Sequence, residues 1–197
     1  FKNRNARMEI VLMALIKLNN QSLTSVSALP AAISTGKVLQ VKYTQFVGTN
    51  TVTIASSGDG TALTDLTVDI TPNATNSVIM LTALFYGEFT TSVAHNCVGF
   101  FFKDTTKLAA PSAGNRHCGI QMGANISYYE SENSTTPEGY HYNYFDTPST
   151  TSQITYKVGL LSNSGTDFNI NKTSTDSTDA ATRQRGISSI VAMEIAG

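Results

Sequence analysis

The chain is poor in charged residues. Asp, Glu, Lys and Arg make up 14% of its 197 residues, against about 25% in an average soluble domain. The net charge is −1, so the sequence lacks the basic surface that nucleic-acid-binding proteins present, and we expect no nucleic-acid partner. Hydrophobic residues account for 41%. Thr, Ser, Asn and Gly fill much of the remainder, and these residues are typical of strands and turns.

Cysteine is equally scarce. Cys97 and Cys118 are the only two, too few for the disulfide framework of a small secreted fold. Each stands in an apolar run, HNCVGFFF or HCGIQM, where a free thiol packs as a small hydrophobic side chain. A chain of this length buries about 70% of its surface on folding, so its stability requires neither a disulfide nor a metal ion.

No apolar run is long enough to cross a membrane as a helix, which takes about 20 residues. Near the N-terminus an apolar run extends from Met8 to Ile16, but Glu9 interrupts it and Lys17 follows it. Basic residues precede the run, as in a signal peptide. The interruption nevertheless favours a short helix over residues 8–18 that packs against partner subunits. We expect no membrane insertion, and an anchoring arm and linker over residues 1–35.

Motifs that carry chemistry are also missing. The sequence has no dinucleotide-binding, phosphate-loop or metalloprotease signature. His95, Cys97, His117 and Cys118 offer ligand atoms for zinc, but His117 and Cys118 are adjacent in a predicted strand, where side chains point to opposite faces. Acidic residues cluster between 130 and 146 in a predicted polar loop, without an evident acid–base pair. We predict no metal, no cofactor and no enzymatic activity.

From Gly36 onward, short segments of alternating apolar and polar residues are present. KVLQVKYTQF is the first of about ten such segments, and turn residues separate them about every 8–12 positions. The later segments lie at 51–55, 66–70, 77–87, 97–103, 117–122, 142–145, 152–161, 167–171 and 187–195. This pattern is typical of a β-sandwich or jelly roll. We predict an all-β antiparallel sandwich over residues 36–197.

One segment, SVIMLTALFYG at 77–87, is apolar on both faces. A sandwich strand needs only one apolar face, so the second face requires another burial partner. VGFFF at 98–102 and ISSIVAMEI at 187–195 share this tendency. Because such a patch is a liability for a monomer, we predict an oligomer. The predicted interface residues are Ile79, Leu81, Phe85 and Phe101, or the alternate side chains of the same strands.

The longest predicted loop, residues 123–141, is rich in tyrosine. Tyrosine combines a flat apolar ring with a hydrogen-bonding tip, which suits contacts with sugars and proteins. Strand alternation places Tyr140 and Tyr142 on one face. We predict a receptor-binding platform formed by Tyr128, Tyr129, Tyr140 and Tyr142. The alternative is that the alternating tyrosines are strand residues packed at a subunit interface.

Several stretches of the sequence, taken together, resemble a known family of proteins. They are ALIKLNNQSLTSVSALP, TGKVLQVKY, FDTPSTTSQITYKVGLL with TDFNINKT, and SSIVAMEIAG. Together they resemble small fibre or appendage proteins of tailed bacteriophages, especially marine ones. The resemblance extends from Met13 to Gly197 and is carried by structural positions. It implies an N-terminal arm that attaches to the virion and a C-terminal sandwich that trimerises like jelly rolls of the tumour-necrosis-factor type.

The resemblance therefore implies a homotrimeric fibre or decoration protein on the virion surface, assembled in the host cytoplasm. Residues 1–35 would contact other virion proteins, and residues 36–197 would be displayed toward the host. A tail fibre, a head fibre and a capsid decoration protein would all share these features. The alternative is an adhesion module that itself binds a carbohydrate or receptor on the host.

Overall fold

The computed structural model describes residues 37–90, 97–122, 137–176, 181 and 183–197. These ranges form strands connected by turns and loops. The predicted arm over residues 1–35 lies outside them and remains a prediction. The strands are β1 Val38–Phe46, β2 Asn50–Thr53, β3 Thr61–Ile70, β4 Val78–Phe89, β5 Cys97–Lys103, β6 Thr106–Leu108, β7 Gln121–Met122, β8 Glu138–Asp146, β9 Ile154–Ser162, β10 Asp167–Ile170 and β11 Ser188–Ile195.

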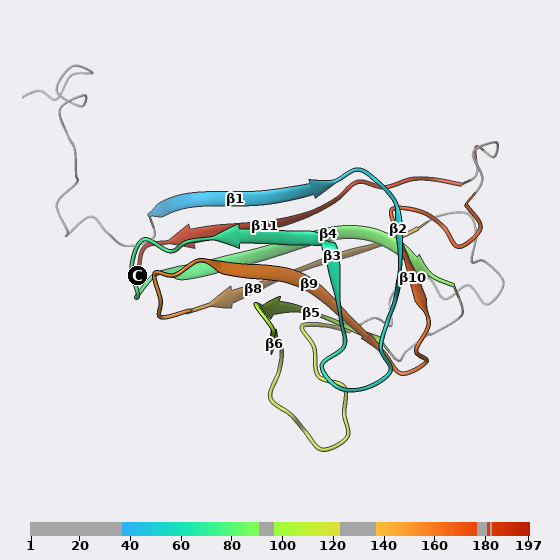
Figure 1. Ribbon diagram of the computed structural model, residues 1–197, viewed down its shortest axis with the longest axis horizontal. Coiled ribbons are helices and arrows are strands. Elements are labelled where there is room, and N and C mark those ends of the chain that lie inside the picture. Colours follow the sequence, from blue (N-terminus) through green and yellow to red (C-terminus); the bar gives the residue numbers. More distant parts are fainter. Residues whose placement is uncertain (1–36, 91–96, 123–136, 177–180, 182) are drawn as a thin grey trace, which may run out of the picture. The chain divides into compact units, whose positions relative to one another are not determined.

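The strands form two antiparallel sheets (Figure 1). In the six-stranded sheet the order is β1-β11-β4-β10-β2, and β8 pairs with the opposite edge of β4. In the five-stranded sheet the order is β3-β9-β5-β6, and β7 also pairs with β5. The predicted all-β antiparallel sandwich is confirmed for the described residues.

The inner faces of the two sheets pack together around one apolar core. Successive strand residues point to opposite faces, so every second residue of β4 and β9 is buried in this core. These residues are Ile79, Leu81, Ala83 and Phe85 in β4, and Ile154, Tyr156, Val158 and Leu160 in β9. Strands β3, β8, β10 and β11 contribute further buried side chains. The core thus joins strands from both sheets.

This packing corrects the predicted subunit interface. Ile79, Leu81, Phe85 and Phe101 are all fully buried in the core of a single chain, so the prediction that these four form an interface is wrong. A strand with two apolar faces does not reveal from its own pattern which face turns inward, and the opposite sheet decides it. A subunit contact on β4 must use the alternate side chains.

The outer face of β5 is covered by the chain itself. Phe100 and Phe102 point away from the main core and form a second buried cluster with Val98 and Leu161. Ala109 and Ile120, from the segment that connects β6 with β7, pack against this cluster. The two-sided apolarity of VGFFF therefore has its burial partner within the chain, and it does not indicate a subunit contact.

A buried carboxylate fixes β1 to the edge of its sheet. Glu194 on β11 is fully buried and accepts hydrogen bonds from Ser77 Oγ and Gln40 Nε2, both at 2.6 Å. The backbone N and Nδ2 of Asn73 also donate to it, both at 2.7 Å. Burial raises the pKa of Glu194, but these hydrogen bonds outweigh burial and leave the pKa below its ordinary value. One carboxylate thus joins β1, β11 and the turn before β4.

Candidate functional site

The outer face of the six-stranded sheet carries a continuous row of apolar side chains. Strand register places Val41 of β1 opposite Met193 of β11, Met193 opposite Met80 of β4, and Met80 opposite Phe145 of β8. The ends of the row are open to solvent, because Val41 is 47% exposed and Phe145 is 56% exposed. Met80 and Met193 are half-buried by their neighbours. Four neighbouring strands therefore present one apolar row to solvent.

Neighbouring rows extend this surface, which we call the outer apolar face. One row joins Tyr43, Val191, Thr82 and Asn143, and the next joins Gln45, Ser189, Leu84 and His141. On the other side of the first row lie Val38, Ile195 and Val78. None of the residues in these rows is Asp, Glu, Lys or Arg. The first row is apolar, and the neighbouring rows mix apolar with uncharged polar side chains. A contiguous exposed apolar row of this kind is typical of an interaction surface.

The outer apolar face ends at a pocket beside Tyr86, the outward residue that follows Leu84 on β4. The pocket has a volume of about 420 Å³ and is lined by Tyr86, Pro137, Gln184, Arg185, Gly186 and Ile187. Gly186 must lack a side chain, because a Cβ there would lie 2.6 Å from the Cβ and Cγ of Tyr86. Ile187 is 52% exposed, so the apolar surface continues to the rim of this pocket.

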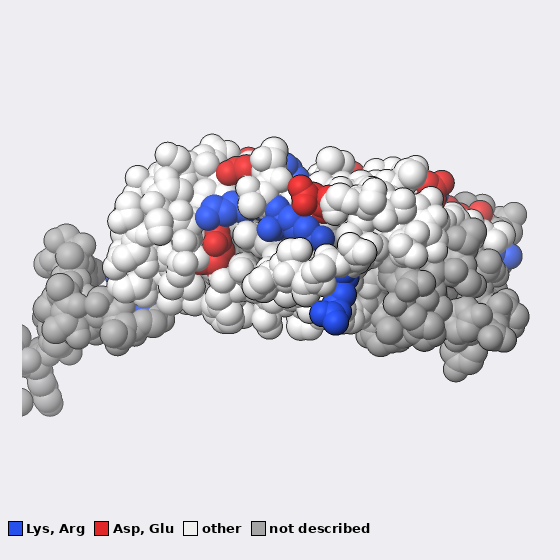
Figure 2. Space-filling view, turned by 90° about the horizontal axis from the view of Figure 1, so that it is seen from below, with Lys and Arg blue, Asp and Glu red and all other residues white. Residues whose placement is uncertain are grey.

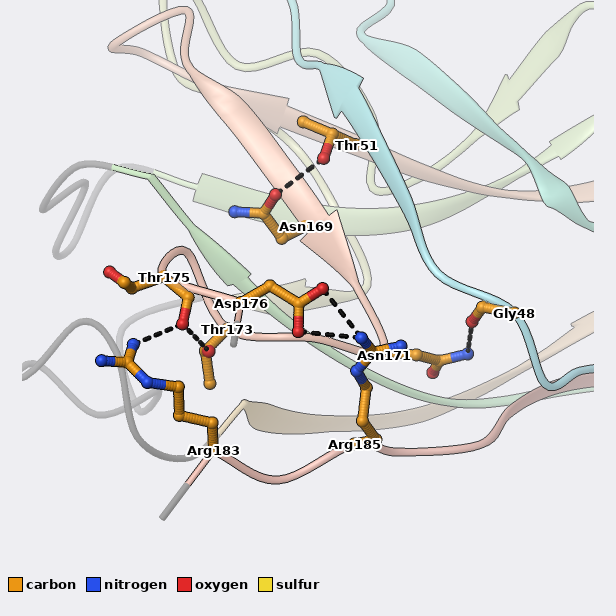
Figure 3. Close-up of polar contacts among 9 residues, drawn as sticks. All are labelled: Gly48, Thr51, Asn169, Asn171, Thr173, Thr175, Asp176, Arg183 and Arg185. Atoms are coloured by element: carbon orange, nitrogen blue, oxygen red, sulfur yellow. Dashed lines mark hydrogen bonds and ion pairs between the residues drawn. The ribbon is translucent and has the colours of Figure 1, made fainter. Parts of the chain in front are cut away.

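Asn171 holds the elements around this pocket together, and Figure 3 shows its contact with Gly48. It has left-handed backbone geometry, with φ of 59°, and it is fully buried. Its Nδ2 donates to the backbone oxygens of Phe46 and Gly48, each at 2.8 Å. Its backbone N donates to the Tyr86 oxygen at 2.9 Å, and Ser188 Oγ donates to its Oδ1. Asn171 thus joins the chain after β10 to β4, the β1–β2 turn and the start of β11.

Two arginines organise the segment that leads into β11. Arg185 NH2 contacts both carboxylate oxygens of Asp176, at 2.8 and 2.9 Å, and Arg183 donates to the backbone oxygen of Thr175 (Figure 3). The Arg185–Asp176 pair is partly exposed, so it positions the segment more than it stabilises the fold. The arrangement places Arg185 in the wall of the pocket at Tyr86.

The predicted tyrosine platform is wrong in its described half. Tyr140 and Tyr142 are only 3% and 5% exposed and belong to the main core. The Tyr140 ring stacks on Phe85 with centroids 4.7 Å apart, and Tyr142 OH donates to the backbone oxygen of Phe100 at 3.0 Å. Both tyrosines stand on the inward face of β8, where the opposite sheet covers them. Tyr128 and Tyr129 lie outside the described residues.

The part of the chain that the structure describes contains no group of three or more His, Cys, Asp or Glu placed to hold a metal ion. His117 and Cys118 precede the short strand β7, and both line a pocket next to β6. The prediction that they lie on opposite faces of one strand is therefore wrong. Within the same ranges no helix has the length and apolarity needed to cross a bilayer.

No protein-family model matches the chain, and no curated protein matches its sequence. These comparisons therefore assign no function to the chain, and the surfaces of the molecule provide the structural evidence for one. Among the described residues the outer apolar face is an extended feature, and it contains Met80, one of the alternate side chains of β4 that the sequence offers for an interface. Met193 and Phe145 are not part of that prediction. The alternation of β4 indicates Val78, Met80 and Leu84, but only the pairing of β4 with β11 and β8 adds Met193 and Phe145 to the row.

Proposed function

We propose that the chain is a structural protein of a bacteriophage virion, a homotrimer whose sandwich is a jelly roll of the tumour-necrosis-factor type. In this proposal three copies associate through the outer apolar face. Residues 1–35 contact other virion proteins, and residues 36–197 are displayed on the particle toward the host. The resemblance of the sequence to phage appendage proteins supplies the virion role and the three-fold state.

The observation that carries the proposal is the uncharged apolar row from Val41 through Met193 and Met80 to Phe145. Covering apolar surface contributes about 25 cal/mol per Å², so association of this face is favourable. The outer apolar side chains of β5 are buried by the chain itself. The outer apolar side chains of β4 and β11 are not covered by any of the described residues. Association of this sheet with the same sheet of other copies would bury the outer face of β4 and β11.

The virion role is tested on particles of the phage that encodes the chain. Antibodies raised against the full chain should label the surface of purified particles in immunogold electron microscopy, and mass spectrometry of the same particles should detect the chain. Particles that lack both the label and the chain would contradict the virion role.

A second candidate function is binding of a host surface glycan by the chain itself. It is favoured by a pocket with three basic side chains on the other sheet, next to β6. This pocket is separate from the outer apolar face, so both functions are compatible with one trimer.

A further inference from the structure

The open pocket next to β6 is lined by the β2–β3 turn, β6, the segment that follows β6 and one residue of β9. The turn between β2 and β3 contributes Gly58 and Asp59, β6 contributes Lys107, and the segment after β6 contributes most of the remaining wall. The pocket volume is about 280 Å³, close to the lower end of the range for small-molecule sites, about 300–1,000 Å³. Its other lining residues are Ala109, Ala110, Ser112, Arg116, His117, Cys118 and Leu161.

Positive charge predominates in this pocket. Lys107, Arg116 and His117 line it together with only one carboxylate, Asp59. Within the described ranges, neither Lys107 nor Arg116 forms an ion pair with an acidic side chain. In Figure 2, which views the molecule from the side where β6 lies in Figure 1, basic side chains gather with a few acidic ones between them. Among the described residues the pocket therefore has more cationic side chains than carboxylates, and Asp59 balances only part of their charge.

Lys107 is held in place by an aromatic ring. Its Nζ lies 4.2 Å from the centroid of the Phe100 ring, a cation–π contact that restricts the side chain without occupying its hydrogen-bond donors. Partial burial lowers the pKa of Lys107, more than the nearby charge of Asp59 raises it. An anion in the pocket would compensate for the water that this ammonium group has lost.

The segment that carries Arg116 and His117 is fixed by local hydrogen bonds. Cys118 Sγ donates to the backbone oxygens of Pro111 at 3.3 Å and Arg116 at 3.6 Å. The backbone N of Arg116 donates to the Ala113 oxygen at 3.4 Å. Cys118 lines the pocket together with Arg116 and His117, so the reactivity of its thiol can report on what enters.

We propose that this pocket binds the acidic group of a surface polysaccharide, a carboxylate, sulfate or phosphate carried on a sugar ring. Lys107, Arg116 and His117 provide donors for the anion, and Ser112 provides a hydroxyl for a neighbouring sugar oxygen. Ala109, Ala110 and Leu161 provide the small apolar wall on which the C–H face of a sugar can rest. The assignment of the anion to a surface polysaccharide rests on the proposed display of the chain toward the host.

The charge of the whole chain favours a polysaccharide over a nucleic acid. Nucleic acids bind to extended basic surfaces that contact several phosphates, whereas this chain has a net charge of −1 and the basic pocket is compact, with a volume of about 280 Å³. A pocket of this size accommodates one acidic sugar residue at a time.

Alkylation of Cys118 tests the electrostatic part of the proposal on the intact chain. Iodoacetate and iodoacetamide both form a thioether with the thiolate and release iodide, but only iodoacetate carries a negative charge. We expect the iodoacetate-to-iodoacetamide rate ratio at Cys118, followed by peptide mass spectrometry, to be at least threefold higher than for free cysteine. Cys97 should not interfere, because it is buried and burial raises its pKa to about 11.

Substitutions separate the pocket from the rest of the surface. Lys107→Met and Arg116→Gln should each lower the rate ratio toward that of free cysteine. Lys42→Gln removes an exposed lysine on β1, outside the pocket, and should leave the ratio unchanged. A wild-type ratio equal to that of free cysteine, or a ratio that neither pocket variant lowers, would overturn the anion site.

The source of the anion is tested by protection of Cys118 from iodoacetamide. Oligouronate should slow the reaction at a concentration at least tenfold below that required for inorganic phosphate, and uncharged dextran should not protect. Equal protection by phosphate, or better protection by a single-stranded oligonucleotide, would overturn the polysaccharide assignment. The outcome is independent of the oligomeric state, because the pocket shares no residue with the outer apolar face.

Discussion

At the scale of single residues, two buried polar side chains, Glu194 and Asn171, each form hydrogen bonds to several segments of the chain. The Glu194 carboxylate receives four hydrogen bonds from three residues. Asn171 joins four segments through its side chain and backbone. A buried polar group that loses its partner costs about 1–3 kcal/mol, so these residues determine which segments stay together.

Glu194 should make the fold sensitive to acid. Its folded pKa is below the ordinary value, so its carboxylate stabilises the native state above the unfolded pKa. This contribution is lost as the pH falls through the folded pKa. We expect Glu194→Gln to lower the free energy of unfolding by about 1.5–3 kcal/mol at pH 7. In urea denaturation the difference from wild type should shrink below pH 4.5; a constant difference at all pH values would contradict this account.

Tyr142 should contribute to stability through both its ring and its hydroxyl group. Tyr142→Phe removes the hydrogen bond to the Phe100 oxygen and should cost about 1 kcal/mol. Tyr142→Ala also removes a buried ring and should cost about 3–5 kcal/mol. Thr147, just after the end of β8, is exposed and lies outside the outer apolar face, so Thr147→Ala should change the free energy of unfolding by less than about 0.5 kcal/mol. Equal effects of Tyr142→Ala and Thr147→Ala would place the tyrosine outside the core.

At the scale of elements, the strand pattern predicted much of the architecture but not the orientation of each face. Most predicted segments coincide with strands, because alternation and turn residues are local properties of the sequence. The sequence predicts only residues 142–145 of β8 as a strand and places the preceding residues in a loop, although tyrosines at alternate positions are typical of a half-buried strand. The faces of β4 could not be distinguished because both are apolar, and only packing against the opposite sheet decides between them.

The two faces of β4 should respond differently to a charge. Met80→Glu places a carboxylate on the outer apolar face and should abolish self-association while the monomer remains folded. Leu81→Glu places a carboxylate in the core, where an unpaired charge is strongly unfavourable, and should unfold the chain. Circular dichroism measures folding and size-exclusion chromatography measures association. Loss of the fold in both variants, or continued association of Met80→Glu, would contradict the assignment of the faces.

At the scale of the whole molecule, the two sheets have different outer surfaces. The outer face of β5 is covered by the segment after β6, which also forms the basic pocket. The outer apolar face of the other sheet is covered by nothing in the described part of the chain. Sequence composition could not reveal this asymmetry, because it arises from which segment folds back over which sheet. We propose that contacts between copies cover this face.

The mass of the full chain in solution tests this assignment most directly. Multi-angle light scattering at micromolar concentration should give a mass three times the 21.1 kDa of one chain, because in the proposed homotrimer each copy would bury its outer apolar face. A mass of one chain at this concentration would contradict the account.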